Sequence, residues 1–427
     1  MVVKNYGDRI QAHYLALAGI EKARALLFQD ARQRSHTGLN HGQGIYNAAD
    51  QFRDVALGRG QFRVIRRGRD DEGGGVMYGV SDEESRLNLN QASAADLGKL
   101  QGMTPDVLAA IMDWRDEDNT VSPNGAEADY YLSLQPPSMP RNGPFQTVRE
   151  LLMVRGVTRD LLLGKDLHQN GSLEAASEDG RESETASSAD SGWASLLTVD
   201  STVNNVNASG EDRINVQQAA EGGLTTVKGI TQEIAKAIVA YRGQNQLQSL
   251  ADLLDVTSAQ NQNQSRGGRG YTATPGQNQS AADAQSGNAS GSNPSGPKVI
   301  SQNLLMEIAD DVTVEQGTEL TGVVNINTAS LEVLTCLPGM TKDLAQRVIS
   351  YRQSNGFFSN VAWLFKVQGM TQEIFKQVAP RVEVRSETFR ILSEGKVNST
   401  GARKRIQAIV HVGLSSVVTV SYREDDL

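Results

Sequence analysis

"GMTPD" at residues 102–106 has a form that this chain uses five times: glycine, an apolar residue, threonine, any residue and an acid. Glycine can take the left-handed conformation that ends a helix. The threonine hydroxyl can then cap the next helix, and an acid in its first turn suits the helix dipole. Each copy is therefore predicted to be a tight turn between two helices. The other copies are "GVTRD" at 156–160, "GITQE" at 229–233, "GMTKD" at 339–343 and "GMTQE" at 369–373.

These turns belong to a longer repeat. Three of them are preceded by related stretches: "LNLNQAS" at 87–93, "INVQQAA" at 214–220 and "VNINTAS" at 324–330. The same three are followed by related tripeptides: "DWR" at 113–115, "AYR" at 240–242 and "SYR" at 350–352. Each unit then closes with an apolar segment that we predict to be helical. The pattern indicates three related helical modules, the second of which runs into a long polar stretch.

The repeated unit resembles the helix-hairpin-helix motif of DNA-binding proteins, including the competence DNA receptor. That resemblance implies a hairpin with two glycines whose amides bind a phosphate. Here Thr104, Thr231 and Thr341 take the place of the second glycine, and an acid follows two residues later. A carboxylate at that helix N-terminus would occupy the position that a phosphate needs. We therefore expect modules that serve packing, and nucleic acid is an unlikely partner for a chain with net charge −9.

Two regions outside the modules read as β-strands. "QFRVIRR" at 61–67 and "VMYGVSD" at 76–82 alternate in polarity around a glycine-rich turn. Three further strands are expected near the end of the chain. They are "TFRIL" at 388–392, "RIQAIVHV" at 405–412 and "VVTVSY" at 417–422. We predict an α+β fold with one antiparallel sheet, interrupted by residues 88–382. The opening helix would cover the sheet with a face made of Ile10, Tyr14 and Leu17.

The chain is long enough for several domains, and its composition shifts mark their limits. Two tracts lack apolar periodicity and read as disordered linkers, one rich in Ser, Glu, Asp and Ala and the other in Gln, Asn, Gly and Ser. The predicted division is a discontinuous α+β domain at 1–87 and 383–427, a first module at 88–170, a linker at 171–212, a second module at 213–257, a linker at 258–298 and a third module at 299–382.

The first module differs from the others by an insertion. In it, 28 residues (116–143) separate the "DWR" tripeptide from Pro144, whereas four residues fill the equivalent space in the other two modules. Against the calcium loop of EF-hands, Asp116 would stand at position 1, Asp118 at 3, Thr120 at 5 and Glu127 at 12. The match is partial, because a valine stands where that loop requires glycine and a proline interrupts it.

Oxygen ligands alone favour a hard cation, and calcium over magnesium where few waters remain. We therefore predict calcium as the cofactor of the insertion. The candidate metal ligands are Asp116, Asp118, Thr120, Glu127 and Asp129. The alternative interpretation is a solvated acidic loop, which is what most charge runs are. The aromatic and proline residues of the insertion favour a loop that packs.

Several spaced motifs agree in order with one family. "DEESRLNLNQAS", "DWRDEDN", "GAEADYY" and "PFQTVRELLMVRGVT" resemble the minor pseudopilin K (GspK) family of bacterial type II secretion systems, most strongly over residues 82–162. The resemblance implies a pilin-like helix and sheet interrupted by an α-domain that binds calcium. The N-terminal leader and transmembrane half-helix of that family are absent from this sequence, so we expect a soluble fragment.

The resemblance also implies a function at the tip of a periplasmic pseudopilus, where a subunit with so large an insertion would meet nothing above it. The implied partners are the minor pseudopilins I and J, with H near by, and the secretin or secreted substrates are further candidates. The full-length protein would be periplasmic and anchored to the inner membrane, which it would touch only through the absent helix. The alternative function is a type IV pilus or competence-associated DNA-binding protein.

An enzyme is not expected. The five histidines show no metal-ligand spacing, and the single cysteine, Cys336, ends an apolar helix where a buried inert thiol is expected. The glycine runs precede no lysine and serine or threonine of a phosphate-binding loop. The sequence therefore predicts no catalytic residues and no organic cofactor.

Overall fold

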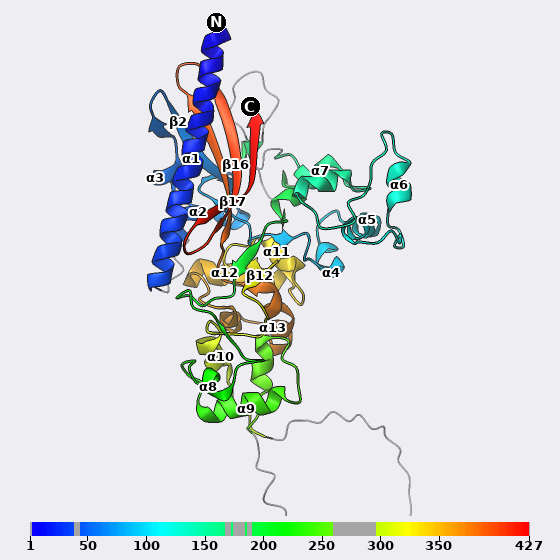
Figure 1. The fold of residues 1–427 in the computed structure, drawn as a ribbon, viewed down its shortest axis with the longest axis vertical. Coiled ribbons are helices and arrows are strands. Elements are labelled where there is room, and N and C mark those ends of the chain that lie inside the picture. Colours follow the sequence, from blue (N-terminus) through cyan, green and yellow to red (C-terminus); the bar gives the residue numbers. More distant parts are fainter. Residues whose placement is uncertain are drawn as a thin grey trace, which may run out of the picture.

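The computed structural model describes residues 2–37, 43–166, 172–173, 184–185, 190–258 and 296–426. A long helix, α1 (Val2–Thr37), lies along an antiparallel sheet at one end of the molecule, and the helical modules occupy the other end and one side (Figure 1). The sheet has the order β1-β2-β15-β16-β17, with β3 paired to β2 and β4 to β15. Its strands are β1 (Val55–Leu57), β2 (Gly60–Arg67), β3 (Val76–Tyr78), β4 (Ser81–Asp82), β15 (Thr388–Val397), β16 (Arg403–Val412) and β17 (Val417–Asp426).

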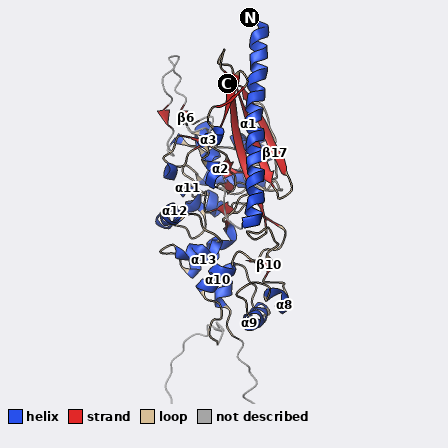
Figure 2. Ribbon diagram, turned by 90° about the vertical axis from the view of Figure 1, so that its left-hand side faces the viewer, coloured by secondary structure: helices blue, strands red, loops and turns tan. Residues whose placement is uncertain are grey.

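This arrangement confirms the predicted α+β fold and the single antiparallel sheet built from both ends of the chain. β15 pairs with β2 from Leu392↔Ile65 to Val397↔Gly60, so strands more than three hundred residues apart are direct neighbours. Figure 2 shows α1 covering one face of the sheet. Short elements accompany the sheet domain and its surroundings: α2 (Gln43–Tyr46), α3 (Ala49–Phe52), η1 (Asp70–Glu72), β6 (Ser172–Leu173) and β7 (Glu184–Thr185).

The predicted contact face of α1 is wrong at two of its three residues, whereas Leu17 packs against the core between α1 and the sheet. Ile10 is 41% exposed and Tyr14 is 63% exposed, and they point away from the sheet. Small side chains make the true contact, because the helix backbone can then approach the strands closely. A Cβ atom added to Gly395 of β15 would lie 2.2 Å from the carbonyl oxygen of Ala12. The buried face consists of Ala12, Leu15, Ala16, Ile20, Ala23, Leu27 and Ala31.

All five glycine–threonine turns adopt the predicted geometry. The glycines have positive φ angles, which run from 72° at Gly339 to 101° at Gly229. The hydroxyl of each threonine accepts a hydrogen bond from the backbone N–H three residues later, as in Thr104 to Val107 at 3.3 Å. The same cap occurs at Thr158, Thr231, Thr341 and Thr371. Each pentapeptide is thus a joint between two helices.

Each module opens and closes with a two-residue strand, and the two strands pair in parallel. The pairs are β5 (Leu87–Asn88) with β8 (Leu197–Thr198), β10 (Ile214–Asn215) with β11 (Val312–Thr313), and β13 (Val324–Asn325) with β14 (Val382–Glu383). The helices of module one are α4 (Ala94–Leu97), α5 (Pro105–Arg115), α6 (Ala128–Leu132), η2 (Val148–Met153), α7 (Arg159–Leu163) and η4 (Trp193–Ser195). Module two has α8 (Glu221–Leu224), α9 (Gln232–Arg242), η5 (Leu250–Asp255) and α10 (Gln302–Ile308). Module three has α11 (Leu331–Cys336), α12 (Lys342–Asn355), η7 (Val361–Lys366), α13 (Gln372–Val378) and η8 (Ala379–Arg381).

The boundary predicted between the second and third modules, at residue 299, is wrong. α10 closes module two: Val299 donates to the carbonyl of Val256 at 3.0 Å, and a Cβ atom at Gly229 would lie 3.0 Å from Leu304. The polar stretch thus interrupts the second hairpin of module two instead of following the module. Its residues 259–295 lie outside the described residues.

The linker predicted at 171–212 is wrong over its second half. Trp193 is 3% exposed, and its Nε1 donates to the carbonyl of Gln101 at 2.9 Å, so residues 190–198 complete module one. β9 (Thr202–Asn204) then pairs antiparallel with β12 (Glu319–Thr321), and the two form a stalk that carries module two. A few buried side chains outweigh the polar composition here. Residues 171–189 lie outside the described residues, except for β6 and β7.

The tripeptide arginines have a shared structural role. Arg115 donates to the carbonyls of Leu89 and Ala92, and Arg352 donates to the equivalent carbonyls of Ile326 and Ala329. Arg242 donates to the carbonyl of Val216. These bonds attach the hairpin helix to the opening stretch of its own module, which explains why the sequence repeats both together.

Candidate metal centre

The insertion of module one brings three carboxylates together. Asp113 lies in the last turn of α5, Asp116 ends that helix, and Glu127 directly precedes α6. Each offers a carboxylate oxygen, and the three oxygens all lie within 4.8 Å of one another. In the described part of the chain, this is the group of acids, histidines or cysteines whose spacing suits a metal ion. The centre is therefore built at the point where the insertion leaves and rejoins the helical frame.

These carboxylates are poorly compensated. Asp113 is 0% exposed and Glu127 is 5% exposed. Within the described residues, both oxygens of Glu127 and the Oδ1 atoms of Asp113 and Asp116 have no hydrogen-bond donor. Burial, followed by the charges of Asp116, Asp113 and Asp118, raises the pKa of Glu127 to about 7. Adjacent carboxyl groups, two of them buried and with four oxygens lacking a donor, are unfavourable unless a proton or a cation joins them.

The surrounding backbone leaves room for the carboxylate of Asp113 and little else. Oδ2 of Asp113 accepts a hydrogen bond from the backbone N–H of Ser122 at 3.2 Å. A Cβ atom at Gly125 would lie 1.9 Å from the same Oδ2, so only glycine fits there. The loop therefore wraps closely around this side chain.

Aromatic side chains hold the insertion in place. The Trp114 ring lies 5.0 Å from that of Tyr131, edge to face, and its Nε1 donates to Glu150 at 3.0 Å. Tyr131 in turn accepts a hydrogen bond from the backbone N–H of Arg155 at 3.2 Å. Asn142 donates to the carbonyl of Asp118 at 2.6 Å, which closes the base of the loop. The insertion is a packed structure.

The structure brings together two of the five ligands predicted from the sequence. Asp116 and Glu127 belong to the cluster. Asp118 is exposed and its Oδ1 accepts the backbone N–H of Thr120 at 2.6 Å, so these two residues form a turn beside the cluster. Asp129 is exposed in the first turn of α6. These three residues lie outside the cluster.

Sequence reasoning missed Asp113, although a signal was present. The first residue of the tripeptide is Asp113 in module one, Ala240 in module two and Ser350 in module three. The acid therefore occurs only in the module that has the insertion. Residues i and i+3 lie on one face of a helix, so Asp113 and Asp116 were also placed side by side by their spacing.

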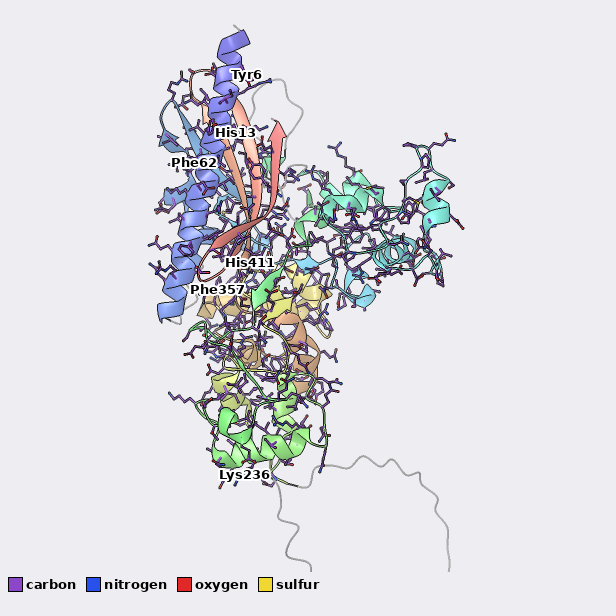
Figure 3. The ribbon with its side chains drawn as sticks, viewed as in Figure 1. Tyr6, His13, Phe62, Lys236, Phe357 and His411 are labelled. Carbon is purple, nitrogen blue, oxygen red and sulfur yellow. The ribbon has the colours of Figure 1, made fainter. Side chains whose placement is uncertain are left out.

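Neither of the two histidines whose side chains the structure describes contributes to the centre. His13 on α1 lies 3.6 Å from Glu424, and His411 on β16 lies 3.8 Å from Glu387. Figure 3 shows these two side chains at different levels of the sheet domain.

The fold and site define a class: an α+β protein in which a long N-terminal helix lies along an antiparallel sheet and a helical insertion carries an acidic centre. A family model described as type II secretion system protein K matches residues 80–164, and one for the helix-hairpin-helix motif matches residues 209–261 and 321–383. The chain is similar to protein K. The type II secretion system protein K of Pectobacterium carotovorum subsp. carotovorum is 32% identical over 163 residues, which cover 36% of this chain and 48% of that protein.

Other relatives match this chain over fewer residues or at lower identity. The ComE operon protein 1 of Bacillus subtilis is 35% identical over 63 residues, which cover 15% of this chain and 31% of that protein. The mouse endonuclease/exonuclease/phosphatase family domain-containing protein 1 is 27% identical over 173 residues, which cover 40% of this chain and 28% of that protein. The chain thus spans less than half the length of these curated relatives.

The crystal structure of the GspK-GspI-GspJ complex from enterotoxigenic Escherichia coli aligns with this chain at a TM-score of 0.47 and 12% identity, over 100% of both chains. Among the described helices of the chain under study, none is both long enough and apolar enough to cross a bilayer.

Proposed function

We propose that this chain is a minor pseudopilin of a type II secretion system, acts at the tip of the pseudopilus and has no enzymatic role. The observation that carries the proposal is the protein K match over residues 80–164, which includes the acidic insertion. The shape supports it, because the N-terminus of α1 and modules two and three lie at opposite ends of the long axis (Figure 1). Because modules two and three lie at the end remote from the N-terminus, they would block another subunit from stacking above this one.

The proposed partners are the minor pseudopilins I and J, with H near by, and the proposed location is periplasmic and associated with the inner membrane. Co-elution of this chain with the periplasmic parts of I and J tests the proposal. We expect one stable ternary peak in size-exclusion chromatography. Separate elution of all three, with and without calcium, would contradict it.

A second candidate is DNA binding, because the helix-hairpin-helix model matches modules two and three. The first-turn acids weigh against it: Glu233 follows the cap of Thr231, and Asp343 follows that of Thr341. A gel shift at low salt discriminates, since salt-sensitive binding lost with Arg403→Ala and Lys404→Ala would favour DNA binding.

We also propose that Asp113, Asp116 and Glu127 bind calcium. All of the converging atoms are carboxylate oxygens, which suit a hard cation, and Glu127 is buried with both oxygens free of donors among the described residues. The ion would offset most of the negative charge of the three carboxylates and tie α5 to α6. Helix α5, the close approach at Gly125 and the contact between Trp114 and Tyr131 hold the three acids in position.

Removing the central ligand is expected to abolish the calcium response. Saturating calcium should raise the Tm of the parent protein by several degrees, because an ion that binds only the folded state stabilises it by mass action. Glu127→Gln should show no rise in Tm. The matched control Asp129→Asn changes an exposed acid outside the cluster and leaves the three ligand residues intact, so it should keep the rise. Differential scanning fluorimetry with calcium and with EDTA measures both. An unchanged parent Tm would contradict the site.

The pH dependence of the centre follows from Glu127. Its folded pKa of about 7 lies above the ordinary value of 4.5, so without metal its contribution to stability is present below about pH 4.5 and is lost as pH rises through about 7. Calcium needs the deprotonated carboxylate, so its affinity should rise over the same range. Isothermal titration calorimetry from pH 6 to pH 8 should show tighter calcium binding at each step, and Glu127→Gln should remove the trend. A flat profile in the parent would contradict the assignment.

A further inference from the structure

Module one differs from its two sister modules in the apolar surface that it exposes. Within the described residues of modules two and three, 213–258 and 296–383, no large apolar side chain is among the exposed ones. Module one exposes several, and six of them form what we term the module-one patch. Its members are Tyr130 (36% exposed), Leu132 (51%), Leu134 (37%), Met139 (61%), Leu152 (42%) and Met153 (52%).

The sister modules show that this exposure is not a property of the repeat. Met153 stands at the position of Asp255 in module two and Lys366 in module three, both charged. Leu152 stands at the position of Leu254, which is 3% exposed, and of Phe365, whose ring packs 4.5 Å from that of Phe375. The two positions are charged or covered in modules two and three, whereas in module one both are apolar and exposed.

Contacts around α6 join the two halves of the patch. The backbone N–H of Ser138 donates to the carbonyl of Tyr131 at 3.1 Å, which folds the chain after α6 back onto that helix. The guanidinium of Arg155 lies 5.3 Å from the centroid of the Tyr130 ring, and its backbone N–H bonds to Tyr131. Since Met153 ends η2 and precedes Arg155 by two residues, these contacts bring the end of η2 close to α6. Figure 1 shows α6 at the outer end of the arm formed by module one.

The charge around the patch indicates what can cover it. The insertion, which carries four of the six patch residues, contains five acids and one base, Arg141, which pairs with Glu150 outside the insertion. The bases near the rest of the patch, Arg149 and Arg155, lie on the η2 side, so the excess of negative charge lies on the insertion. Glu117, Asp118 and Asp129 are exposed. A divalent ion at the metal centre would offset only part of this negative charge. An anionic membrane surface would be repelled, whereas apolar residues flanked by lysine or arginine would meet complementary charge.

We infer that the module-one patch is a docking surface for a cationic amphipathic segment of a partner protein. The inference deepens the proposed function and rests on it, because the metal centre holds the loop that carries most of the patch. The partner's apolar residues cover Leu132, Leu134 and Met139, and its basic residues lie over the acids of the insertion. Exposed apolar clusters of this kind on a soluble surface mark interaction sites.

A pair of synthetic peptides tests the inference on the whole chain. Both are amphipathic helices with the same leucine face, flanked by lysine in one and by glutamate in the other. In fluorescence anisotropy with calcium present, we expect the lysine peptide to bind at least about tenfold more tightly, a difference of about 1.4 kcal/mol. The double variant Leu132→Ser and Met139→Ser should lose that binding. The matched control Val418→Ser and Val420→Ser, which changes exposed apolar residues of β17, should keep it.

Equal binding of the two peptides, or unchanged binding by the module-one variant, would overturn the inference. Co-elution of the same variant with I and J then identifies the partner. If co-elution is lost, the docking segment belongs to one of those subunits, and if it is kept, the segment belongs to another protein. If the parent protein does not co-elute with I and J, the proposed function is contradicted. The peptide binding is a separate measurement and still tests the docking surface. Circular dichroism of the variant checks that its helical content is unchanged.

Discussion

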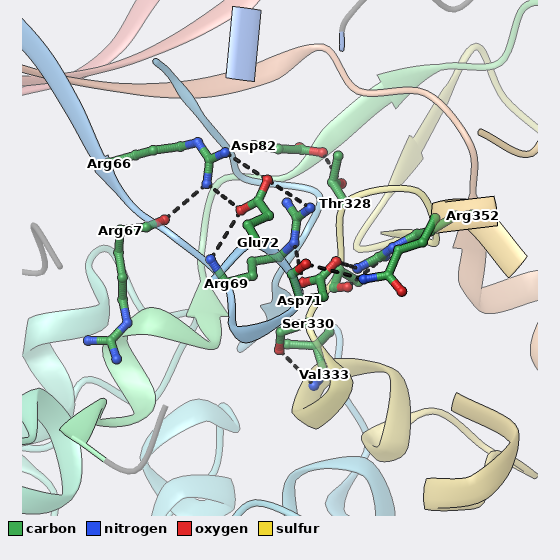
Figure 4. Close-up of polar contacts among 12 residues, drawn as sticks. Arg66, Arg67, Arg69, Asp71, Glu72, Asp82, Thr328, Ser330, Val333 and Arg352 are labelled. Atoms are coloured by element: carbon green, nitrogen blue, oxygen red, sulfur yellow. Dashed lines mark hydrogen bonds and ion pairs between the residues drawn. The ribbon is translucent and has the colours of Figure 1, made fainter. Parts of the chain in front are cut away.

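Replacing Arg352 with methionine is expected to lower the free energy of unfolding by about 3–5 kcal/mol, the usual cost of removing one partner from a buried ion pair. Arg352 is 5% exposed. It donates to Asp71 at 2.9 Å and to the carbonyls of Ile326 and Ala329 at 2.9 and 2.8 Å. Figure 4 shows Arg352 directed toward Asp71, beside Arg69 and Glu72. The residue thus joins module three to the β2–β3 connection of the sheet domain.

Arg242 provides the matched control, because it holds the same position in module two. It donates to the carbonyl of Val216 at 2.8 Å, is only partly buried, and forms no ion pair with a described residue. Arg242→Met should therefore cost about 1 kcal/mol, the net value of an ordinary hydrogen bond. Urea unfolding followed by tryptophan fluorescence compares the two, with Trp363 in η7 as the reporter in module three. Equal losses would show that the Arg352–Asp71 contact adds nothing to stability.

Gly395→Val is expected to destabilise the sheet domain by about 3 kcal/mol, at the upper end of the cost of overpacking. The added Cβ would lie 2.2 Å from the carbonyl oxygen of Ala12 and 2.5 Å from the backbone nitrogen of Ala16. α1 would have to move away from β15 to admit it. The small side chains that line this contact would then be exposed.

Gly7→Val is the control for that substitution. Gly7 lies within α1, and a Cβ atom added there would meet nothing within 4 Å. Its change in stability should stay within about 1 kcal/mol, the range of helix propensities. Limited proteolysis of α1, together with thermal unfolding, measures both variants. Parent-like stability of Gly395→Val would mean that the helix does not approach the sheet as closely as described.

Local chemistry made the joints and strands predictable. Glycine and threonine act on their immediate neighbours, so "GMTPD" and its copies report the turn directly, and period-two alternation reports strands such as β16. The contact face of α1 depended instead on what lies opposite. Tyr14 has a larger apolar surface than Ala12, yet the close approach of the β15 backbone at Gly395 selects the small residue. Hydrophobic periodicity alone cannot anticipate that choice.

The errors in module limits and in the metal centre share a different cause. Module two is completed by α10, which follows a polar stretch long enough to look like a boundary. Module one is completed by Trp193, Ala194 and Leu197, which are buried although they lie in a polar tract. At the centre, reasoning from the EF-hand loop looked forward from Asp116 and so passed over Asp113, one helical turn earlier. The contacts that decide these cases are long-range, and composition within a window does not contain them.

The stalk of β9 and β12 brings the two ends of module two to one place. Glu319 pairs with Asn204, and Ile214 donates to the carbonyl of Asp311 at 2.8 Å, so the chain enters and leaves the unit side by side. Module two, which lies between β9 and β12, can therefore be gained, lost or replaced without altering the path of the remaining chain. The same reasoning applies to the sheet domain, whose own strands admit all three modules between β4 and β15. The molecule is therefore a set of nested insertions, and any of them can change in length while the helix and sheet keep their shape.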